Sequence, residues 1–101
     1  MTYRLSKKAD EDIIRIYLDG AEQFGVAQAD AYHASLERSF DFLAENPRAA
    51  REREELSPAF RAHPHKAHVI LYRVEERGIF IVRVRHARED WVSRPIDDAV
   101  L

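Results

Sequence analysis

Two amphipathic segments dominate the first half of the chain. From Ala9 to Phe24, apolar residues recur every three or four positions, which places them along one side of an α-helix. Ser6 precedes the segment as a candidate N-cap, and Gly25 follows it as a natural helix-ending residue. The pattern therefore predicts a first helix that ends at Phe24. The polar residues expected on its solvent side are Asp12, Arg15, Asp19 and Glu22.

A second helix is predicted from about Val26 to Glu45. It ends at Asn46-Pro47, because proline cannot continue the backbone hydrogen bonding of a helix. With only one or two residues between them, the two helices must fold back on each other as an antiparallel hairpin. The apolar positions that share one face of the second helix are Ala29, Tyr32, Leu36, Phe40 and Leu43.

Three large apolar side chains fall outside these stripes. Ile14 and Leu18 lie one turn apart, beyond the edge of the buried arc of the first helix, and Phe42 points away from the stripe of the second. They either pack between the helices or form a docking surface for another chain. The periodicity leaves both interpretations open.

The second half of the chain is organised around a predicted strand hairpin. Two runs rich in β-branched and aromatic residues, 68–74 and 79–85, flank a polar connector that ends in Gly78. The first run is apolar on both faces, which favours a central strand. In the second, we expect Phe80, Val82 and Val84 to face the helices. The residues then left on the open face are Ile79, Ile81, Arg83 and Arg85.

Two shorter strands complete the predicted sheet. Residues 3–5 alternate apolar and polar positions before the first helix, and residues 59–63 form an edge strand that ends at Pro64. The charged run 48–55 is typical of a solvated turn. We therefore expect one α+β domain over residues 1–101, with an N-terminal antiparallel helical hairpin packed on a small, mostly antiparallel four-stranded sheet in the order β-α-α-β-β-β.

Composition restricts the environment of the chain. It has 101 residues, of which 46% are hydrophobic and 34% charged, and no apolar run reaches the roughly 20 residues that a membrane-spanning helix needs. Neither cysteines nor an apolar signal core point to secretion, so we expect a cytoplasmic protein. Residues 59–88 contain seven Lys and Arg against two acidic residues, and this half would attract an anionic partner.

Few motifs carry chemistry. His63, His65 and His68 have a spacing that could supply metal ligands, but a strand turn with an intervening proline favours a solvated basic turn, so no metal and no cofactor are expected. A cationic cluster follows the last strand: Arg83, Arg85, His86 and Arg88, with Arg73 on the neighbouring strand and Trp91 beyond. Such a cluster could cleave RNA, with the histidine moving a proton, or could bind acidic groups without chemistry.

Several motifs in fixed order give the chain a family resemblance. They are Tyr3-Arg4-Leu5-Ser6, the Phe24-Gly25 break, Asn46-Pro47-Arg48, residues 68–74, and the closing run Arg83-Val84-Arg85-His86-Ala87-Arg88-Glu89-Asp90-Trp91. In this order the chain resembles the ParE branch of the RelE/ParE toxin superfamily of type II toxin-antitoxin systems. The resemblance covers nearly the whole length, and the closing run is its most specific part.

The resemblance implies a non-enzymatic, cytoplasmic toxin that binds DNA gyrase and forms a hetero-oligomer with a ParD-like antitoxin, without membrane association or sequence-specific nucleic-acid binding. It makes Arg73, Arg83, Arg85, His86, Arg88 and Trp91 candidates for contact with the target or the antitoxin. It makes Ile14, Leu18 and Phe42 candidates for the antitoxin groove. The alternative is the RelE branch of ribosome-dependent mRNA endonucleases, which His86 and Arg61 keep open although residues 69–70 are apolar where a basic residue would be expected.

Overall fold

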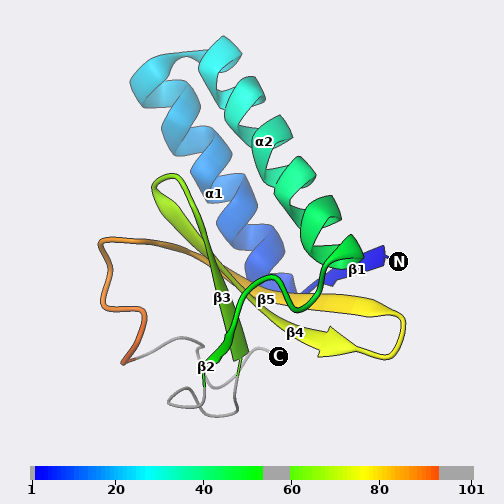
Figure 1. The fold of residues 1–101 in the computed structure, drawn as a ribbon. Helices are drawn as coiled ribbons and strands as arrows, with labels where there is room; N and C mark the ends of the chain where they lie inside the picture. The colour runs from blue at the N-terminus through cyan, green and yellow to red at the C-terminus, as the bar shows by residue number, and fades with distance from the viewer. Residues whose placement is uncertain (1, 54–59, 94–101) are drawn as a thin grey trace.

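The computed structural model describes residues 2–53 and 60–93 and has two layers, a helical hairpin and a sheet (Figure 1). The elements are β1 (Thr2–Leu5), α1 (Lys7–Phe24), α2 (Val26–Glu45), β2 (Glu52–Arg53), β3 (Phe60–His65), β4 (His68–Glu75) and β5 (Gly78–His86). The strand order is β1-β5-β4-β3-β2, with β1 parallel to β5 and the other neighbours antiparallel. The predicted α+β class is confirmed, but the sheet has five strands rather than four, because part of the charged run 48–55 pairs with β3.

Both helices begin and end where the sequence predicts. Ser6 caps α1 by accepting a hydrogen bond from the Ala9 N–H at 2.9 Å, and its own hydroxyl donates to the Val82 carbonyl at 2.6 Å. Gly25 separates the helices at a φ of 92°, a left-handed conformation that suits glycine. One serine side chain therefore fixes the start of α1 against β5.

The main core lies between the hairpin and one face of the sheet. Phe40 and Leu43 of α2 pack in it together with Ile13 of α1. Tyr72 is fully buried there and donates a hydrogen bond to the Pro47 carbonyl at 2.7 Å, which ties β4 to the end of α2. The sheet-proximal part of each helical stripe and most of the two-sided apolar β4 are thus buried as the pattern predicts, and β4 is central in the sheet.

The predicted faces of β5 are wrong at its beginning. Ile79 and Ile81 belong to the helix-facing core, whereas Phe80 and Val82 pack on the opposite face with Phe60. A β-bulge explains the error, since Leu71 of β4 pairs with residue 83 and the next residue, 72, pairs with residue 81. The extra residue shifts the alternation, so Val84 faces the helices as predicted while the residues before the bulge are reversed.

The predicted edge strand is β3, and it is not the edge at its start, because β2 pairs with residues 60 and 61. Pro64 does not end this strand but lies inside it, opposite Val69. Its position is tolerated because β2 pairs only with residues 60 and 61, so the outer edge of β3 at Pro64 has no strand that needs an N–H. The beginning of the predicted strand, Ala59, lies outside the described residues.

The hairpin is longer than the part of the sheet that it covers (Figure 1). Near the sheet Ala9 and Ile13 are buried, but Phe24 at the far end of α1 is 69% exposed. The apolar stripe of α1 therefore continues past the core. The end of the hairpin extends beyond the sheet, and this leaves space between the hairpin end and the strand ends.

Candidate binding surfaces

Arg83 is an interior residue, which corrects the expectation that it lies on an exposed cationic face. Its Nε donates to Asp12 Oδ2 at 2.7 Å and its Nη2 to Asp12 Oδ1 at 2.9 Å. The two side chains are 7% and 2% exposed. Asp12, predicted to face solvent, also accepts a hydrogen bond from the Val84 N–H at 3.0 Å. This buried bidentate pair joins α1 to β5 and leaves Arg83 unable to contact a partner.

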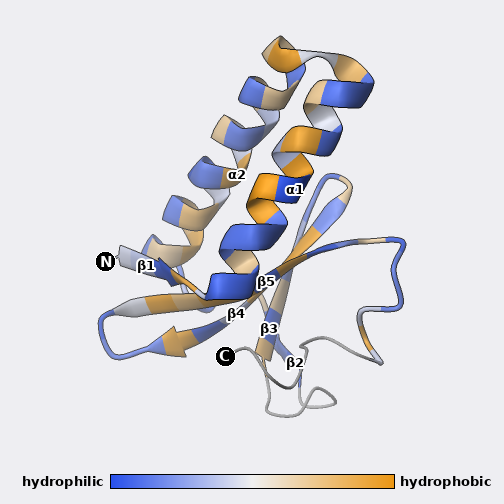
Figure 2. Cartoon of the chain, turned by 180° about the vertical axis from the view of Figure 1, so that it is seen from behind, coloured by the Kyte–Doolittle hydropathy of each residue, from blue (hydrophilic) through white to orange (hydrophobic). Residues whose placement is uncertain are grey.

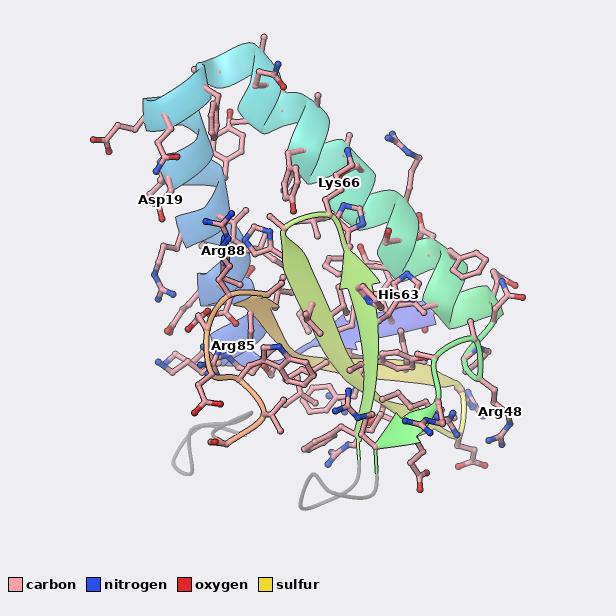
Figure 3. The ribbon with its side chains drawn as sticks, turned by 60° about the vertical axis from the view of Figure 1, so that its left-hand side comes forward. Asp19, Arg48, His63, Lys66, Arg85 and Arg88 are labelled. Carbon is pink, nitrogen blue, oxygen red and sulfur yellow. The ribbon has the colours of Figure 1, made fainter. Side chains whose placement is uncertain are left out.

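The other predicted residues at the end of β5 form a compact turn. Arg85 Nη2 donates to Glu89 Oε2 at 3.2 Å, and the His86 N–H donates to Glu89 Oε1 at 2.8 Å. Burial acts to raise the pKa of Glu89, but these hydrogen bonds outweigh it and lower that pKa. The Arg88 side chain is exposed beside the turn (Figure 3). Of the four candidates on this segment, His86 and Arg88 remain the most accessible to a ligand.

Arg73 and Trp91 lie away from that turn, on the sheet face opposite the helices. Trp91 packs against the cluster that contains Phe80, and the Arg73 guanidinium lies 4.8 Å from the Phe80 ring centroid. On the same ring the Arg4 guanidinium is 4.3 Å from the centroid. Here arginine and aromatic groups cover the small second core by cation–π contacts.

Ile14 and Leu18 form an exposed apolar surface on α1. Figure 2 shows hydrophobic and hydrophilic residues alternating along this helix. Ile14 and Leu18 are 52% and 60% exposed, so they do not pack between the helices. With neighbouring residues they line a shallow depression of about 300 Å³, called here the α1 groove, made by Ile13, Ile14, Tyr17, Leu18 and His33.

Phe42 does not line the α1 groove. It is 49% exposed, and its ring centroid lies 6.2 Å from that of His63 in β3. The structure therefore brings two of the three predicted groove residues together and places the third beside the edge of the sheet.

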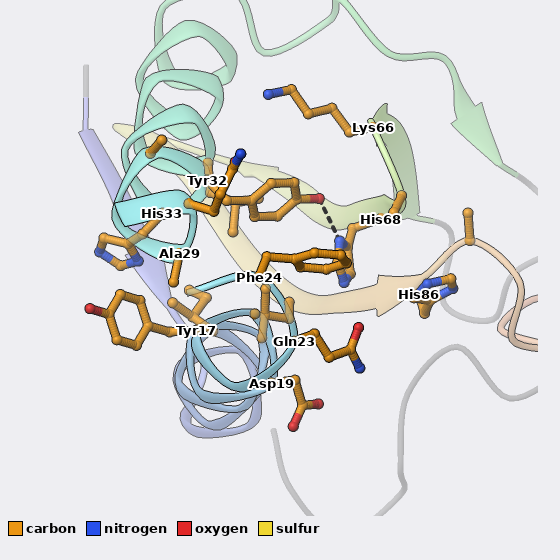
Figure 4. Close-up of a pocket in the computed structure, with 18 of the residues that line it drawn as sticks. Tyr17, Asp19, Gln23, Phe24, Ala29, Tyr32, His33, Lys66, His68 and His86 are labelled. Atoms are coloured by element: carbon orange, nitrogen blue, oxygen red, sulfur yellow. Dashed lines mark hydrogen bonds between the residues drawn. The ribbon is translucent and has the colours of Figure 1, made fainter. Parts of the chain in front are cut away.

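The histidines of the β3–β4 turn are partly buried against α2 rather than solvated. His65 Nε2 lies 3.0 Å from the Ser35 hydroxyl, and its Nδ1 lies 2.8 Å from that of Ser39. His68 Nδ1 lies 2.5 Å from the Tyr32 hydroxyl (Figure 4). Within residues 2–53 and 60–93, no group of three or more His, Cys, Asp or Glu side chains is arranged to hold a metal ion.

His68 also faces a second histidine. The ring centroids of His68 and His86 lie 5.2 Å apart across the β4–β5 ladder. Burial, followed by repulsion from His86 and His65, lowers the pKa of His68 to about 4. At neutral pH this ring is therefore an uncharged hydrogen-bonding group.

These histidines form part of the wall of a larger cavity beneath the hairpin end, called here the overhang pocket (Figure 4). Its volume is about 850 Å³. Helix α1 contributes Ile16, Asp19 and Phe24, and α2 contributes Ala29 and Tyr32. The strand ends and turns close the other side with Lys66, His68, His86 and Arg88.

Comparison with known proteins decides the family. Residues 3–91 match the family described as the ParE toxin of type II toxin-antitoxin system, parDE. The chain belongs to the ParE toxin family. Toxin ParE1 of Mycobacterium tuberculosis strain H37Rv is 36% identical over 89 residues, which are 87% of this chain and 91% of that protein. Toxin ParE1 of Caulobacter vibrioides is 34% identical over 84 residues, covering 83% of this chain and 86% of the relative.

A solved structure shares the fold of this ParE-family chain. It is described as the chromosomal ParDE TA system from P. aeruginosa and aligns with a TM-score of 0.73 at 22% sequence identity. The alignment covers 85% of this chain and 95% of that chain. In the described part of this ParE-family protein, no helix has the length and apolarity that crossing a membrane requires.

Sequence reasoning missed several residues that shape these surfaces. Asp12 looked like a solvent-facing residue, although an acid one helical turn from Ala9 and close to the buried Ile13 was a signal of an interior partner. Tyr32 was recognised only as a core residue, and His68 only as a candidate metal ligand. Lys66 and Phe24 were not considered as site residues, because nothing local shows that a turn and a helix end face the same cavity.

Proposed function

We propose that this ParE-family toxin inhibits growth in the cytoplasm by binding DNA gyrase, without chemistry of its own, and that a ParD-like antitoxin neutralises it. The observation that carries the proposal is the family match over residues 3–91, together with relatives of similar length that are named Toxin ParE1. Gyrase is the target that the resemblance to the ParE branch implies.

The scattering of the candidate nuclease residues supports binding rather than catalysis. Arg61 donates to the Ala50 carbonyl at 2.7 Å and lies opposite Tyr72, whereas His86 lies opposite His68. Those two β4 positions, 72 and 68, are four positions apart, which is roughly 13 Å along a strand. Arg83, a third cationic candidate, is bound to Asp12 in the interior. Arg61, Arg83 and His86 therefore do not meet at one point of the sheet, which supports the binding proposal over the endonuclease alternative.

The α1 groove is the surface that we assign to the antitoxin. Ile14 and Leu18 leave a contiguous apolar area in water, and covering it with an apolar side of a partner would remove that area from solvent. Glutamate at both positions should weaken antitoxin co-purification by about 2 kcal/mol or more, because each charge would be desolvated at the contact. Ala27→Glu, at an exposed position outside the groove, is the matched control.

The target is tested by expressing the toxin from an inducible promoter without its antitoxin. We expect growth arrest with a DNA damage response, and accumulation of linear DNA when purified toxin is added to gyrase and supercoiled plasmid. Ribosome-dependent cleavage of mRNA with intact DNA would instead assign the chain to the endonuclease alternative. Normal growth at a high level of folded toxin would contradict both.

A further inference from the structure

The overhang pocket borders the α1 groove, with which it shares Ile13, Tyr17 and His33. Its other end gathers hydrogen-bond donors around the candidate contact residues His86 and Arg88. His86 Nδ1 accepts a hydrogen bond from the Arg88 N–H at 3.0 Å, so the hydrogen of the neutral His86 ring is on Nε2. The His68 ring lies beside it, and Arg88 also lines the pocket. This end of the pocket therefore favours an acceptor-rich ligand.

Charge in the pocket favours an anion. Lys66 and Arg88 are exposed cations, and within the described ranges neither has a carboxylate at ion-pair distance. The lining contains a single carboxylate, that of Asp19. Lys66 is held over the Tyr32 ring, with its Nζ 5.6 Å from the centroid, so its charge stays at the rim.

The opposite wall is apolar and includes an aromatic ring without a partner in the core. Phe24 is 69% exposed at the end of α1 and lines the pocket (Figure 4). A large aromatic side chain left in water at a cavity wall is available for stacking against a flat ligand. The pocket thus joins an anion-binding end to an aromatic wall.

We propose that the overhang pocket binds a nucleotide, with the phosphate against His68, His86 and Arg88 and the base against Phe24. A phosphate monoester has three terminal oxygens and can use several donors at once, more than a single carboxylate can. The cavity has a volume of about 850 Å³ and is lined by the hairpin, the β3–β4 turn and the segment after β5, a size that accommodates a compact ligand. The nucleotide is either free or exposed in a single strand.

Binding is tested by calorimetry on the full chain with AMP, adenosine, inorganic phosphate and oligoglutamate as separate probes. We expect AMP to bind about tenfold more tightly than adenosine or phosphate alone, because only AMP engages both ends of the pocket. Phosphate binding as tightly as AMP would reduce the site to an anion site and overturn the proposal. Binding of oligoglutamate but not AMP, or of no probe, would also overturn it.

Single substitutions test which pocket residue contacts the base of the nucleotide and which contacts its phosphate. Phe24→Ala should weaken AMP binding about fivefold or more and leave phosphate binding unchanged, since it removes only the stacking surface. Arg88→Ala should weaken both. Arg77→Ala removes an exposed cation from the β4–β5 turn, outside the pocket, and should change neither. Equal effects of Arg77→Ala and Arg88→Ala would mean that net charge, not the pocket, binds the anion.

Competition separates the two sources of nucleotide. A single-stranded oligonucleotide that displaces AMP, with Phe24→Ala weakening both, would identify a strand as the natural ligand. An oligonucleotide that fails to displace AMP would identify a free nucleotide. In either case an NMR titration of the His68 ring should show its pKa rise when AMP is bound, because the phosphate favours the charged imidazole.

Discussion

Arg83 and Arg88 lie five positions apart at the end of one segment and have opposite surroundings. Arg83 is 7% exposed on its side chain and forms two hydrogen bonds with Asp12, whereas Arg88 is exposed at the mouth of the overhang pocket. The first holds α1 on the sheet and the second is free to meet a ligand. Two arginines of one cationic motif, only five positions apart, can thus have different roles. The buried arginine stabilises the fold, and the exposed arginine is available for recognition.

The largest expected loss of stability comes from disrupting the buried Asp12–Arg83 pair. Asp12→Ala leaves the Arg83 guanidinium buried without its carboxylate, which should lower the free energy of unfolding by about 3–5 kcal/mol. Chemical denaturation measures the loss. Replacing both residues with apolar ones, Asp12→Leu with Arg83→Met, should recover only part of it, because the Val84 N–H then loses its carboxylate acceptor. A loss below about 1 kcal/mol for Asp12→Ala would mean that the pair is effectively solvated.

A smaller loss is expected at the start of β5. A Cβ built on Gly78 would lie 1.9 Å from the Thr2 carbonyl oxygen, a backbone atom that cannot move without disturbing the parallel β1–β5 pairing. Gly78→Ala should therefore cost about 1–3 kcal/mol, as overpacking does in well-filled interiors. The melting temperature of Gly78→Ala is compared with that of the exposed control variant Gln23→Ala. Equal melting temperatures would show that β1 is not needed for stability.

His68 should make the stability of the protein depend on pH. The pKa of His68 is about 4 when folded and 6.5 in an ordinary setting, so between these values the unfolded chain binds more protons and stability falls as pH falls. Because the ring is only half-buried, solvent limits its share to about 1 kcal/mol. His63 and His65, whose pKa values burial also lowers, act in the same direction.

His68→Gln tests this share, since it removes the titrating group and keeps a polar side chain. Melting temperatures taken from pH 7 down to pH 4 should fall less steeply for the variant than for the parent. Arg77→Ala should follow the parent curve. A variant curve as steep as the parent's would assign the dependence to the other two histidines.

The smallest effect on stability is predicted for the exposed Arg88. Arg88→Ala should change the free energy of unfolding by no more than about 0.5 kcal/mol, because its guanidinium lies in water and the turn is held by Glu89. The same denaturation experiment as for Asp12→Ala measures it. A loss comparable to that of Asp12→Ala would make Arg88 structural and remove it from the binding surface.

Local signals predicted the elements of this fold well and their faces less well. The boundaries of the two helices could be predicted, because they depend on residues close in sequence: Ser6, Gly25 and Asn46. The faces of β5 could not be predicted, because residues 79–82 are apolar on both sides and the bulge breaks the alternation that Arg83 and Arg85 suggested. Only the partner strand reveals a bulge.

The binding surfaces divide in the same way. Ile14 and Leu18 could be found from the helical wheel, since an apolar residue outside the buried arc either packs on a neighbouring element or is exposed to solvent. The overhang pocket could not, because Phe24, Tyr32, Lys66 and Arg88 come from four separate segments. Their meeting depends on how far the hairpin extends past the sheet, a length that no single segment encodes.

The hydrogen bond from Ser6 to the Val82 carbonyl spans 76 positions, and the parallel β1–β5 ladder beside it spans a similar stretch. While the ribosome is still making the chain, β1 and the start of α1 have no strand to join until β5 has been synthesised. The sheet can close only after residue 86, the end of β5, has emerged from the ribosome, so the ParE-family fold cannot be complete before β5 has been made. A nascent fragment lacking β5 would carry the α1 groove without the sheet that supports it.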